Sequence, residues 1–353
     1  MLTEPELDLA MTQPTEALVR EISSVRSPLL VLGGSGKMGP SLAAMAKRAA
    51  ELAGVDLRVI AVARFSDQAA RGWLRNHGVE TVACDLLDPT QVATLPNAGD
   101  IIYMAGRKFG TTDNPALTWA MNVLPPEYVC RRFPDARVVA LSTGCVYPLV
   151  PVGQGGSREG DELTPIGEYS NACVARERVF EYLSATVGTR VCLIRLNYAL
   201  DLRYGVLVDI ATKVLNGVPI DLSIGYLNAI WQRDANAMIL RALSLAQSPA
   251  VPLNLTGPET LSVRQLAERF GELLGRAPVF AGSESPVALL NDSSNAHQLL
   301  GPPETPIEQV IEWTARWLQH NGRTLGKPTH YEVADGRYTR NKVVCEKGMM
   351  GLR

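Results

Sequence analysis

The stretch Val31-Leu32-Gly33-Gly34-Ser35-Gly36-Lys37-Met38-Gly39 decides the fold that this sequence predicts. Its glycines at 33, 36 and 39 lie between an apolar run, 28–32, and an alanine-rich segment, 41–50. The run predicts a short buried strand and the segment predicts a helix. In such a turn one glycine allows a tight bend, one lets the backbone approach a pyrophosphate, and one lets the helix pack closely on the strand. The stretch therefore predicts a dinucleotide-binding turn whose phosphates face the helix N-terminus.

Strand and helix patterns alternate from position 28 to about 200. Strands are expected at 29–32, 57–62, 81–84, 101–104, 137–141 and 191–196, with helices between them, notably over Pro115–Arg131 and Glu168–Ala185. This alternation predicts an α/β fold with a doubly wound parallel (Rossmann) sheet over residues 28–200. Residues 201–321 predict a smaller, mainly helical substrate-binding region with one strand, Val251–Leu255, returning to the sheet. Residues 1–27 are expected to form a polar N-terminal arm with a short helix over 14–20, and residues 322–353 a polar tail.

Composition narrows the class of protein. The chain has 353 residues, 46% of them hydrophobic, and a net charge of −2. This balance provides no general attraction for nucleic acid or anionic membranes, and no apolar run is long enough to span a bilayer. The acidic N-terminus lacks a signal-peptide core, and the cysteines form no C-x-x-C pair. We expect a cytoplasmic protein with reduced thiols, no metal site, and no nucleic-acid or membrane partner.

The end of the second strand predicts the choice of cofactor. A carboxylate at this place would bind the ribose hydroxyls of NAD, but the sequence has Ala63 followed by Arg64. An arginine suits the 2′-phosphate of NADP, because its planar fork makes charge-assisted hydrogen bonds. NADP is therefore favoured over NAD, and the alternative is a solvated arginine after a strand. Asp85, after the third strand, is placed to accept a hydrogen bond from the adenine amino group.

The order of these motifs resembles the extended short-chain dehydrogenase/reductase family, of the NAD-dependent epimerase/dehydratase type. The resemblance covers about residues 28–321 and rests on the turn at 33–39, Asp85, Ala105-Gly106, Trp119–Val123, Ser142–Pro148, Tyr169 with Glu177, Arg195–Tyr198 and Asn254–Ser262. It implies hydride transfer between NAD or NADP and a small polar substrate: a sugar, sugar acid or nucleotide sugar. The residues it assigns to the cofactor, together with those argued above, are Gly33, Ser35, Gly36, Lys37, Met38, Gly39, Arg64, Asp85, Leu86, Ala105, Gly106, Tyr169 and Asn197.

The same resemblance implies the catalytic residues. Tyr169 would be the general acid/base, Thr143 would orient the substrate oxygen, and Asn122 would support a water relay. The family has a lysine one helical turn after the tyrosine, where this sequence has Cys173. A free phenol titrates near pH ~10, so poising it near ~7 requires roughly 4 kcal/mol, which a thiol cannot supply. Lys108, in the loop after the fourth strand, is the expected replacement cation, and the alternative is a solvated surface lysine.

The expected substrate contacts are Cys145, Arg203, Tyr204 and Trp231. Cys145 stands where the family's dehydratases have a glutamate, and this argues against sugar 4,6-dehydration. Arg203 and Tyr204 would present a cation and a phenol to a polar ligand, and Trp231 would stack on a sugar. A surface ion pair for Arg203 and a buried position for Trp231 are the alternatives.

Two further expectations follow from the resemblance. Family members commonly form homodimers through the helices predicted at 115–131 and 168–185, so a homodimer is expected. Cys173 also motivates an alternative function, namely a catalytically weakened cofactor-binding protein that senses redox state or serves as a scaffold.

Overall fold

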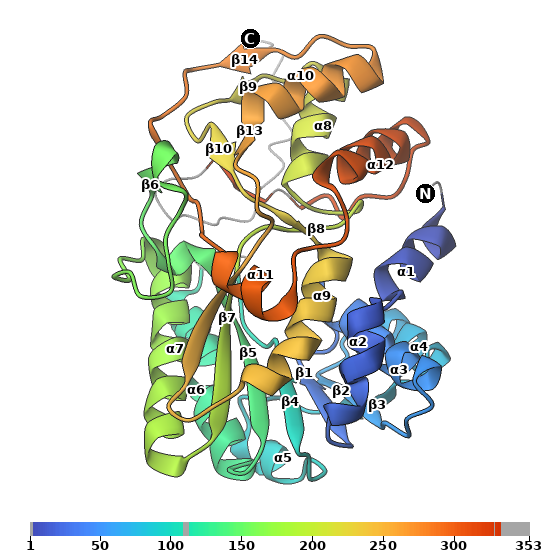
Figure 1. The fold of residues 1–353 in the computed structure, drawn as a ribbon, viewed down its shortest axis with the longest axis vertical. Coiled ribbons are helices and arrows are strands. Elements are labelled where there is room, and N and C mark those ends of the chain that lie inside the picture. The colour runs from blue at the N-terminus through green and yellow to red at the C-terminus, as the bar shows by residue number, and fades with distance from the viewer. Residues whose placement is uncertain (1–2, 109–112, 328, 333–353) are drawn as a thin grey trace, which may run out of the picture.

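The computed structural model describes residues 3–108, 113–327 and 329–332. Its centre is a seven-stranded sheet in the order β12-β7-β5-β4-β1-β2-β3, and all neighbouring strands are parallel (Figure 1). The predicted α/β fold with a doubly wound parallel sheet is confirmed. The strands are β1 (Leu29–Leu32), β2 (Val59–Ala63), β3 (Glu80–Ala83), β4 (Asp100–Tyr103), β5 (Arg137–Thr143), β7 (Arg190–Leu196) and β12 (Val251–Leu255).

Helices cover both faces of this sheet. Residues 29 and 31 of β1 belong to a core shared with α3 and α9, whereas residues 30 and 32 belong to a core shared with α6 and α7. Because both faces are buried, the strands are apolar runs rather than alternating patterns. The helices around the sheet are α3 (Gly39–Leu52), α4 (Gln68–Asn76), α5 (Pro89–Ala93), α6 (Pro115–Arg132), α7 (Gly167–Val187) and α9 (Gln232–Arg241).

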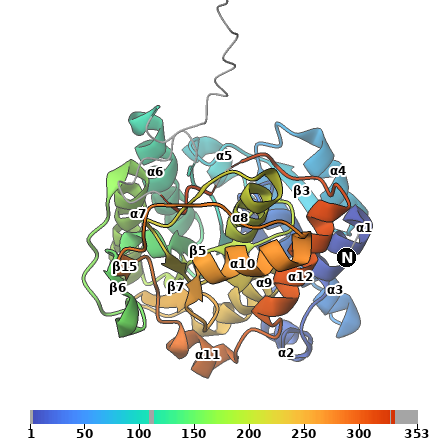
Figure 2. The same cartoon turned by 90° about the horizontal axis from the view of Figure 1, so that it is seen from above.

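A smaller part of the molecule lies beyond the carboxyl ends of the strands. In Figure 1 its helices α8, α10 and α12 stand above the sheet, and the view from above in Figure 2 shows them in front of it. The helices of this part, with α11 beside β12, are α8 (Val206–Asn216), α10 (Val263–Leu274), α11 (Ser294–Leu300) and α12 (Ile307–Gln319). Two-residue strands connect them: β6 (Val150–Pro151), β8 (Ala199–Leu200), β9 (Ile220–Asp221), β10 (Tyr226–Leu227), β11 (Ile230–Trp231), β13 (Leu261–Ser262), β14 (Phe280–Ala281) and β15 (Val287–Ala288).

The N-terminal segment forms two helices packed on the body, α1 (Glu4–Thr12) and α2 (Glu16–Glu21), where the sequence analysis expected an arm with one helix. Leu7 and Met11 lie in the core of the smaller part, and two residues of the α2 segment lie in the core under α3. Thr3 caps α1 through a capping box with Glu6. The segment reads as polar because each short helix buries one narrow apolar face.

The C-terminal segment folds back over the smaller part. The Leu325 backbone N–H donates to the Arg203 carbonyl at 2.8 Å. Thr329 donates from its backbone N–H (2.7 Å) and from its hydroxyl (2.5 Å) to Asp209 of α8. Part of the predicted tail is therefore ordered beside α8, and positions 333–353 lie outside the described residues.

Large side chains are exposed on the surface of α6 and α7. Trp119 and Leu124 of α6 are 39% and 42% exposed, and Tyr182 of α7 is 64% exposed. This is the face expected to form a homodimer, which stays a prediction. Within the described ranges, none of the helices combines the length and the apolar character needed to cross a bilayer.

Candidate active site

The glycine-rich loop joins β1 to α3 at the carboxyl edge of the sheet. Gly33 has a φ of +85°, and a Cβ there would lie 2.8 Å from the Ala105 nitrogen. A Cβ at Gly39 would lie 2.7 Å from the Gly34 carbonyl oxygen, so helix and turn are too close for a side chain. Gly36 differs, because its Cβ would meet just the Gly33 oxygen, at 3.3 Å, among the described residues. The space beside Gly36 is thus open, as the approach of a pyrophosphate requires.

A cavity of about 280 Å³ opens beside this loop, at the carboxyl ends of β1, β4, β5 and β7. Met38, at the N-cap of α3, makes no side-chain hydrogen bond to the helix, so backbone N–H groups of the first turn are available for phosphate oxygens. Besides five loop residues, the lining consists of Met104, Gly106, Arg107, Lys108, Asn122, Leu141, Ser142, Thr143, Cys145, Tyr169, Arg176, Leu196, Asn197, Tyr198, Ala199, Tyr204, Gly205, Val206 and Thr329. The glycine loop and these lining groups fit a bound dinucleotide with a polar substrate beside it.

Tyr169, Cys173 and Arg176 lie on one face of α7, because residues four and seven positions apart share a side of a helix. Tyr169 and Arg176 line the cavity, and Cys173 is fully buried. Arg176 Nη2 donates to Cys173 Sγ at 3.4 Å. Its Nη1 donates to Asn122 Oδ1 at 3.0 Å and to the Ala105 carbonyl at 3.3 Å. Neutral acceptors thus hold the guanidinium close to the phenol.

The environment keeps the Tyr169 phenol protonated. Burial raises its pKa well above the ordinary value, the Cys173 thiol adds to the rise, and the charge of Arg176 opposes it. Burial also raises the pKa of Cys173, so this thiol is neutral at pH 7. A Cβ at Gly106 would lie 2.7 Å from Arg176 Nη1, so the guanidinium depends on a glycine there. The charge that lowers the pKa of the phenol is that of Arg176.

The other predicted catalytic residues lie around the same cavity. Thr143, at the end of β5, accepts a hydrogen bond on Oγ1 from the Cys145 backbone N–H at 3.2 Å. Asn122 is fully buried, and its amide group bonds Arg176 and two carbonyls. Lys108 is half-buried in the lining, but it is not among the main groups that set the pKa of Tyr169. The structure brings Tyr169, Thr143, Asn122 and Lys108 together and adds Arg176 next to the phenol.

A buried polar network lies beneath the cavity and consists of residues from the family motifs. Arg195 Nη2 pairs with Glu177 Oε2 at 2.8 Å, and both side chains are at most 3% exposed. Ser142 donates to Glu177 as well. Arg195 Nη1 donates to the Tyr147 hydroxyl at 2.6 Å, and that hydroxyl donates to Asn254 Oδ1 at 2.9 Å. This network joins β5, α7, β7 and β12, so these motif residues hold the strands that carry the site.

The residues expected at the adenosine end of the cofactor lie outside the cavity lining. Arg64 is exposed and follows β2, and Asp85 follows β3, the parallel neighbour of β2. Asp85 Oδ1 accepts from the Leu87 backbone N–H at 3.0 Å. Leu86 is buried, and Ser35 is exposed in the glycine loop. This edge is where a dinucleotide fold places adenine and its ribose.

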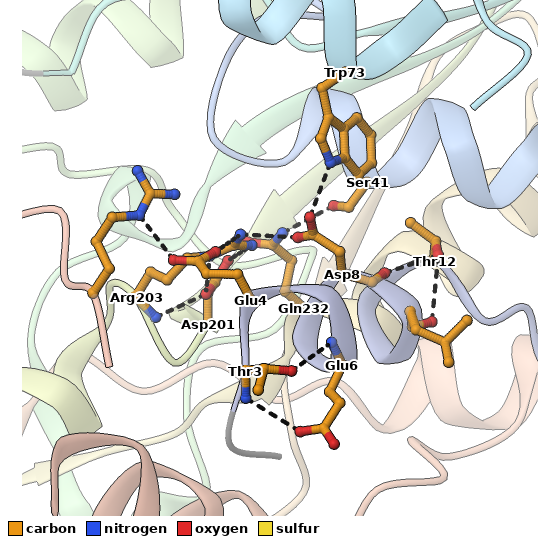
Figure 3. A network of polar contacts seen from close by, with 12 residues as sticks. Thr3, Glu4, Glu6, Asp8, Thr12, Ser41, Trp73, Asp201, Arg203 and Gln232 are labelled. Atoms are coloured by element: carbon orange, nitrogen blue, oxygen red, sulfur yellow. Dashed lines mark hydrogen bonds and ion pairs between the residues drawn. The ribbon is translucent and has the colours of Figure 1, made fainter. Parts of the chain in front are cut away.

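Arg203 is committed to an ion-pair network that ties α1 to the segment after β8 (Figure 3). Its guanidinium lies 3.0 Å from Asp201, 3.0 Å from Asp8 and 3.2 Å from Glu4. Trp231 is 3% exposed and packs against Trp313, with ring centroids 5.6 Å apart. Both residues lie outside the cavity lining, and their contact with substrate stays a prediction. The observed positions match the two alternatives: an ion pair for Arg203 and a buried indole for Trp231.

Asn197 and Tyr204 do line the cavity. Asn197 Nδ2 donates to Asn228 Oδ1 at 2.8 Å. Lys37 Nζ lies over the Tyr204 ring, 4.5 Å from the ring centroid.

The sequence analysis missed Arg176 and Thr329. The seven-residue spacing from Tyr169 was the available signal for Arg176, whereas nothing local marked Thr329. Among the described residues, no group of three or more His, Cys, Asp or Glu side chains is arranged to hold a metal ion.

Residues 29–199 match the family described as NAD dependent epimerase/dehydratase family. No curated protein matches the sequence. Similar solved structures include UDP-glucose 4-epimerase of Thermotoga maritima with UDP-glucose, at 16% identity and a TM-score of 0.67 over 83% of this chain and 99% of that one. A dTDP-glucose 4,6-dehydratase of Bacillus anthracis with NAD has 16% identity and a TM-score of 0.69 over 84% and 97%. UDP-glucuronic acid 4-epimerase of Bacillus cereus with NAD has 14% identity and a TM-score of 0.67 over 83% and 99%.

Proposed function

We propose that this protein is an NAD(P)-dependent oxidoreductase or epimerase that acts on a sugar, a sugar acid or a nucleotide sugar, with Tyr169 as the acid/base. The observation that carries the proposal is that Tyr169 and Thr143 open on the same cavity as the Gly36 loop. A substrate oxygen bound by both hydroxyls lies at the carboxyl ends of the central strands, where the reactive end of a dinucleotide is expected. The similar structures that contain NAD and nucleotide sugars support this class of reaction.

The residues that line the cavity suggest which side chains move the proton. When bound, the dinucleotide supplies or accepts the hydride, and the Gly33–Gly39 loop with Ala105 and Gly106 would hold it. Tyr169 donates its proton to the substrate oxygen when a carbonyl is reduced and accepts that proton when an alcohol is oxidised. Thr143 donates a hydrogen bond to the same oxygen. An epimerase performs both directions in turn at one carbon, so the same two hydroxyls serve either reaction.

Arg176 provides the positive charge that the family takes from a lysine one turn after the tyrosine. Its charge lowers the pKa of Tyr169 against the effects of burial and of Cys173. Arg176 acts as a positioning residue, because its guanidinium donates to the Asn122 amide oxygen, the Ala105 carbonyl and the Cys173 sulfur. The Asn122 amide is occupied by this guanidinium and by two carbonyls, which favours a holding role over the predicted water relay.

A substrate panel tests the proposed activity. The purified chain is incubated with NAD or NADP and with neutral sugars, uronic acids and nucleotide sugars, each at several pH values. Absorbance at the wavelength of the reduced nicotinamide detects net oxidation or reduction, and NMR of the sugar detects epimerisation without net redox change. We expect turnover with at least one of these classes.

The alternative function, a cofactor-binding protein that has lost the chemistry, is favoured by one observation: the Tyr169 pKa is raised and the nearest helical neighbour is the Cys173 thiol. Tight cofactor binding without turnover on the whole panel, and without any gain in Cys173→Lys, would establish this alternative. It would also remove the enzymatic proposal.

The choice of cofactor yields a separate prediction. If Arg64 binds the 2′-phosphate, Arg64→Ala weakens NADP binding by ~1.5–3 kcal/mol, which is typical for a charged hydrogen bond, and leaves NAD binding nearly unchanged. Titration calorimetry with both dinucleotides measures this difference. Arg58→Ala is a suitable control, because Arg58 immediately precedes the same strand, at the end opposite Arg64, and pairs with Glu80. Equal losses for NAD and NADP would show that Arg64 does not read the phosphate.

A further inference from the structure

The segment that follows α12 has no regular secondary structure, but it is anchored to the body of the molecule. We call its residues 323–327 and 329–332 the C-terminal strap. Near its start, the Leu325 backbone N–H donates to the Arg203 carbonyl at 2.8 Å. Near its end, Tyr331 is 2% exposed within the core of the smaller part of the molecule. The strap is therefore fixed on both sides of its middle.

Thr329 of the strap forms part of the cavity wall. It is 3% exposed and lines the cavity together with Tyr204, Gly205 and Val206, which lie at the start of α8. These residues belong to the smaller part, whereas the glycine loop at 33–39 belongs to the sheet. In a doubly wound fold the dinucleotide occupies the carboxyl edge of the sheet, so the wall that the smaller part contributes is left for the substrate.

The hydrogen bonds of Thr329 determine what its hydroxyl can offer to a ligand. The backbone N–H and the hydroxyl both donate to Asp209 Oδ2, at 2.7 and 2.5 Å. A carboxyl oxygen that accepts from an N–H is the unprotonated one, so the hydroxyl is the donor in the second bond as well. A threonine hydroxyl has one proton and two lone pairs. Because its proton is committed to Asp209, the Thr329 oxygen is left as an acceptor.

Asp209 is well placed to hold the hydroxyl in this direction. It lies in the first turn of α8, where the positive end of the helix dipole favours a carboxylate. Burial raises the pKa of Asp209, and the two hydrogen bonds from Thr329 oppose that rise. Removing either partner would leave polar groups of the other unpaired, which is costly away from water. The direction of the Thr329 hydroxyl is therefore set by α8 and not by the strap alone.

We propose that Thr329 is a specificity-determining residue whose hydroxyl accepts a hydrogen bond from one O–H group of the substrate. Asp209 is the positioning residue that keeps the Thr329 proton turned away from the ligand. The inference rests on the proposed function in placing a substrate with several hydroxyl groups in this cavity. A site built to bind one hydroxyl rejects the analogue that lacks it, because the buried acceptor then has no partner. The strap thus adds selectivity for one hydroxyl position.

Equilibrium binding, which does not depend on turnover, tests this proposal. The chain, saturated with its cofactor, is titrated with D-glucose, D-glucuronate and UDP-glucose. Analogues of the tightest binder that lack one hydroxyl of the sugar are then titrated in the same way, and calorimetry gives the dissociation constants. In the wild type we expect one analogue to bind about 3- to 10-fold more weakly than its parent, the range for one neutral hydrogen bond.

Threonine variants identify the acceptor. In Thr329→Val the parent is expected to bind as weakly as that analogue, so the discrimination between the two disappears. Thr329→Ser keeps the hydroxyl and should keep the discrimination. Thr324→Val is the matched control, because Thr324 belongs to the same strap but is exposed and lies outside the cavity lining. Cofactor affinity should change less than threefold in all three variants, which shows that the fold is intact.

Two further variants test the role of Asp209. Asp209→Asn keeps an oxygen that accepts both hydrogen bonds, so it should keep the discrimination. Asp209→Ala frees the Thr329 proton, and the hydroxyl can then donate as well as accept. The discrimination should fall, and the analogue with a keto group at the recognised position should bind more tightly than it does to the wild type. Loss of discrimination in Asp209→Asn, or no gain for the keto analogue in Asp209→Ala, would overturn the positioning role.

The role of Thr329 is overturned by any of these results: Thr329→Val discriminates like the wild type, Thr324→Val loses the discrimination too, cofactor affinity falls in Thr329→Val, no single hydroxyl matters, or none of the three sugars binds. These outcomes are separate from the proposed activity. A chain that discriminates through Thr329 without any turnover keeps the hydroxyl site and loses the enzymatic function. A chain that turns over its substrate but binds every deoxy analogue as well as the parent keeps the function and loses the hydroxyl site.

Discussion

Replacing Tyr169 by phenylalanine is expected to lower turnover by about 10²- to 10⁴-fold, the usual contribution of a positioned acid/base group. The substitution removes the proton donor but keeps the ring, which packs beside the buried cluster of Val146, Tyr147 and Cys173. The fold and the glycine loop should therefore be unaffected, and cofactor affinity should change little. Steady-state kinetics with the best substrate of the panel, together with cofactor titration, measure both quantities.

Tyr182→Phe provides a matched control on the same helix, because the Tyr182 side chain is 64% exposed and lies outside the cavity lining. It should retain wild-type turnover. Turnover of Tyr169→Phe equal to the wild type with every active substrate would remove the phenol from the mechanism.

Replacing Arg176 by methionine is expected to move the pH–rate profile for alcohol oxidation to higher pH. This direction requires the phenolate, and the charge of Arg176 favours the phenolate by lowering the pKa of Tyr169. Without that charge the pKa rises further, so activity at neutral pH falls about tenfold for each pH unit that the midpoint moves. Arg176→Lys keeps a positive charge and should lie between the two profiles.

Two other substitutions separate this role from a loss of packing. Arg178→Met, at an exposed position of α7 paired with Glu181, should leave the profile in place. Thermal unfolding of each variant reports any loss of stability from the Asn122 and Ala105 acceptors that Arg176 leaves. If Lys108→Met moves the midpoint and Arg176→Met does not, then Lys108 is the cation that poises the phenol, as the sequence analysis expected.

The fold was predictable because it depends on local patterns. Apolar runs bounded by turn residues identify strands that are buried on both faces, and glycines at fixed spacing identify the turn between β1 and α3. The atoms that a side chain at each glycine of that turn would meet belong either to residues a few positions away or to the segment that follows the neighbouring strand. The N-terminal helices were mostly missed, because the apolar side chains of residues 7 and 11 are buried only once α1 packs against α3 and α9.

The sequence by itself determined the parallel sheet and the dinucleotide loop, because these follow from periodicity and connection length. The family resemblance indicated Thr143, at the end of β5, and Tyr169, in the first turn of α7. The tertiary structure decided which charges meet in the cavity. Arg176 reaches the phenol through Asn122 and the Ala105 carbonyl, which lie about 54 and 71 residues away along the chain. Arg203 donates a hydrogen bond to Asp8, which is 195 residues away along the chain. Thr329, near the other end of the chain, lines the cavity. Such pairings depend on long-range packing, because an ion pair or hydrogen bond forms with whatever partner the folded chain brings near, whatever the distance along the sequence.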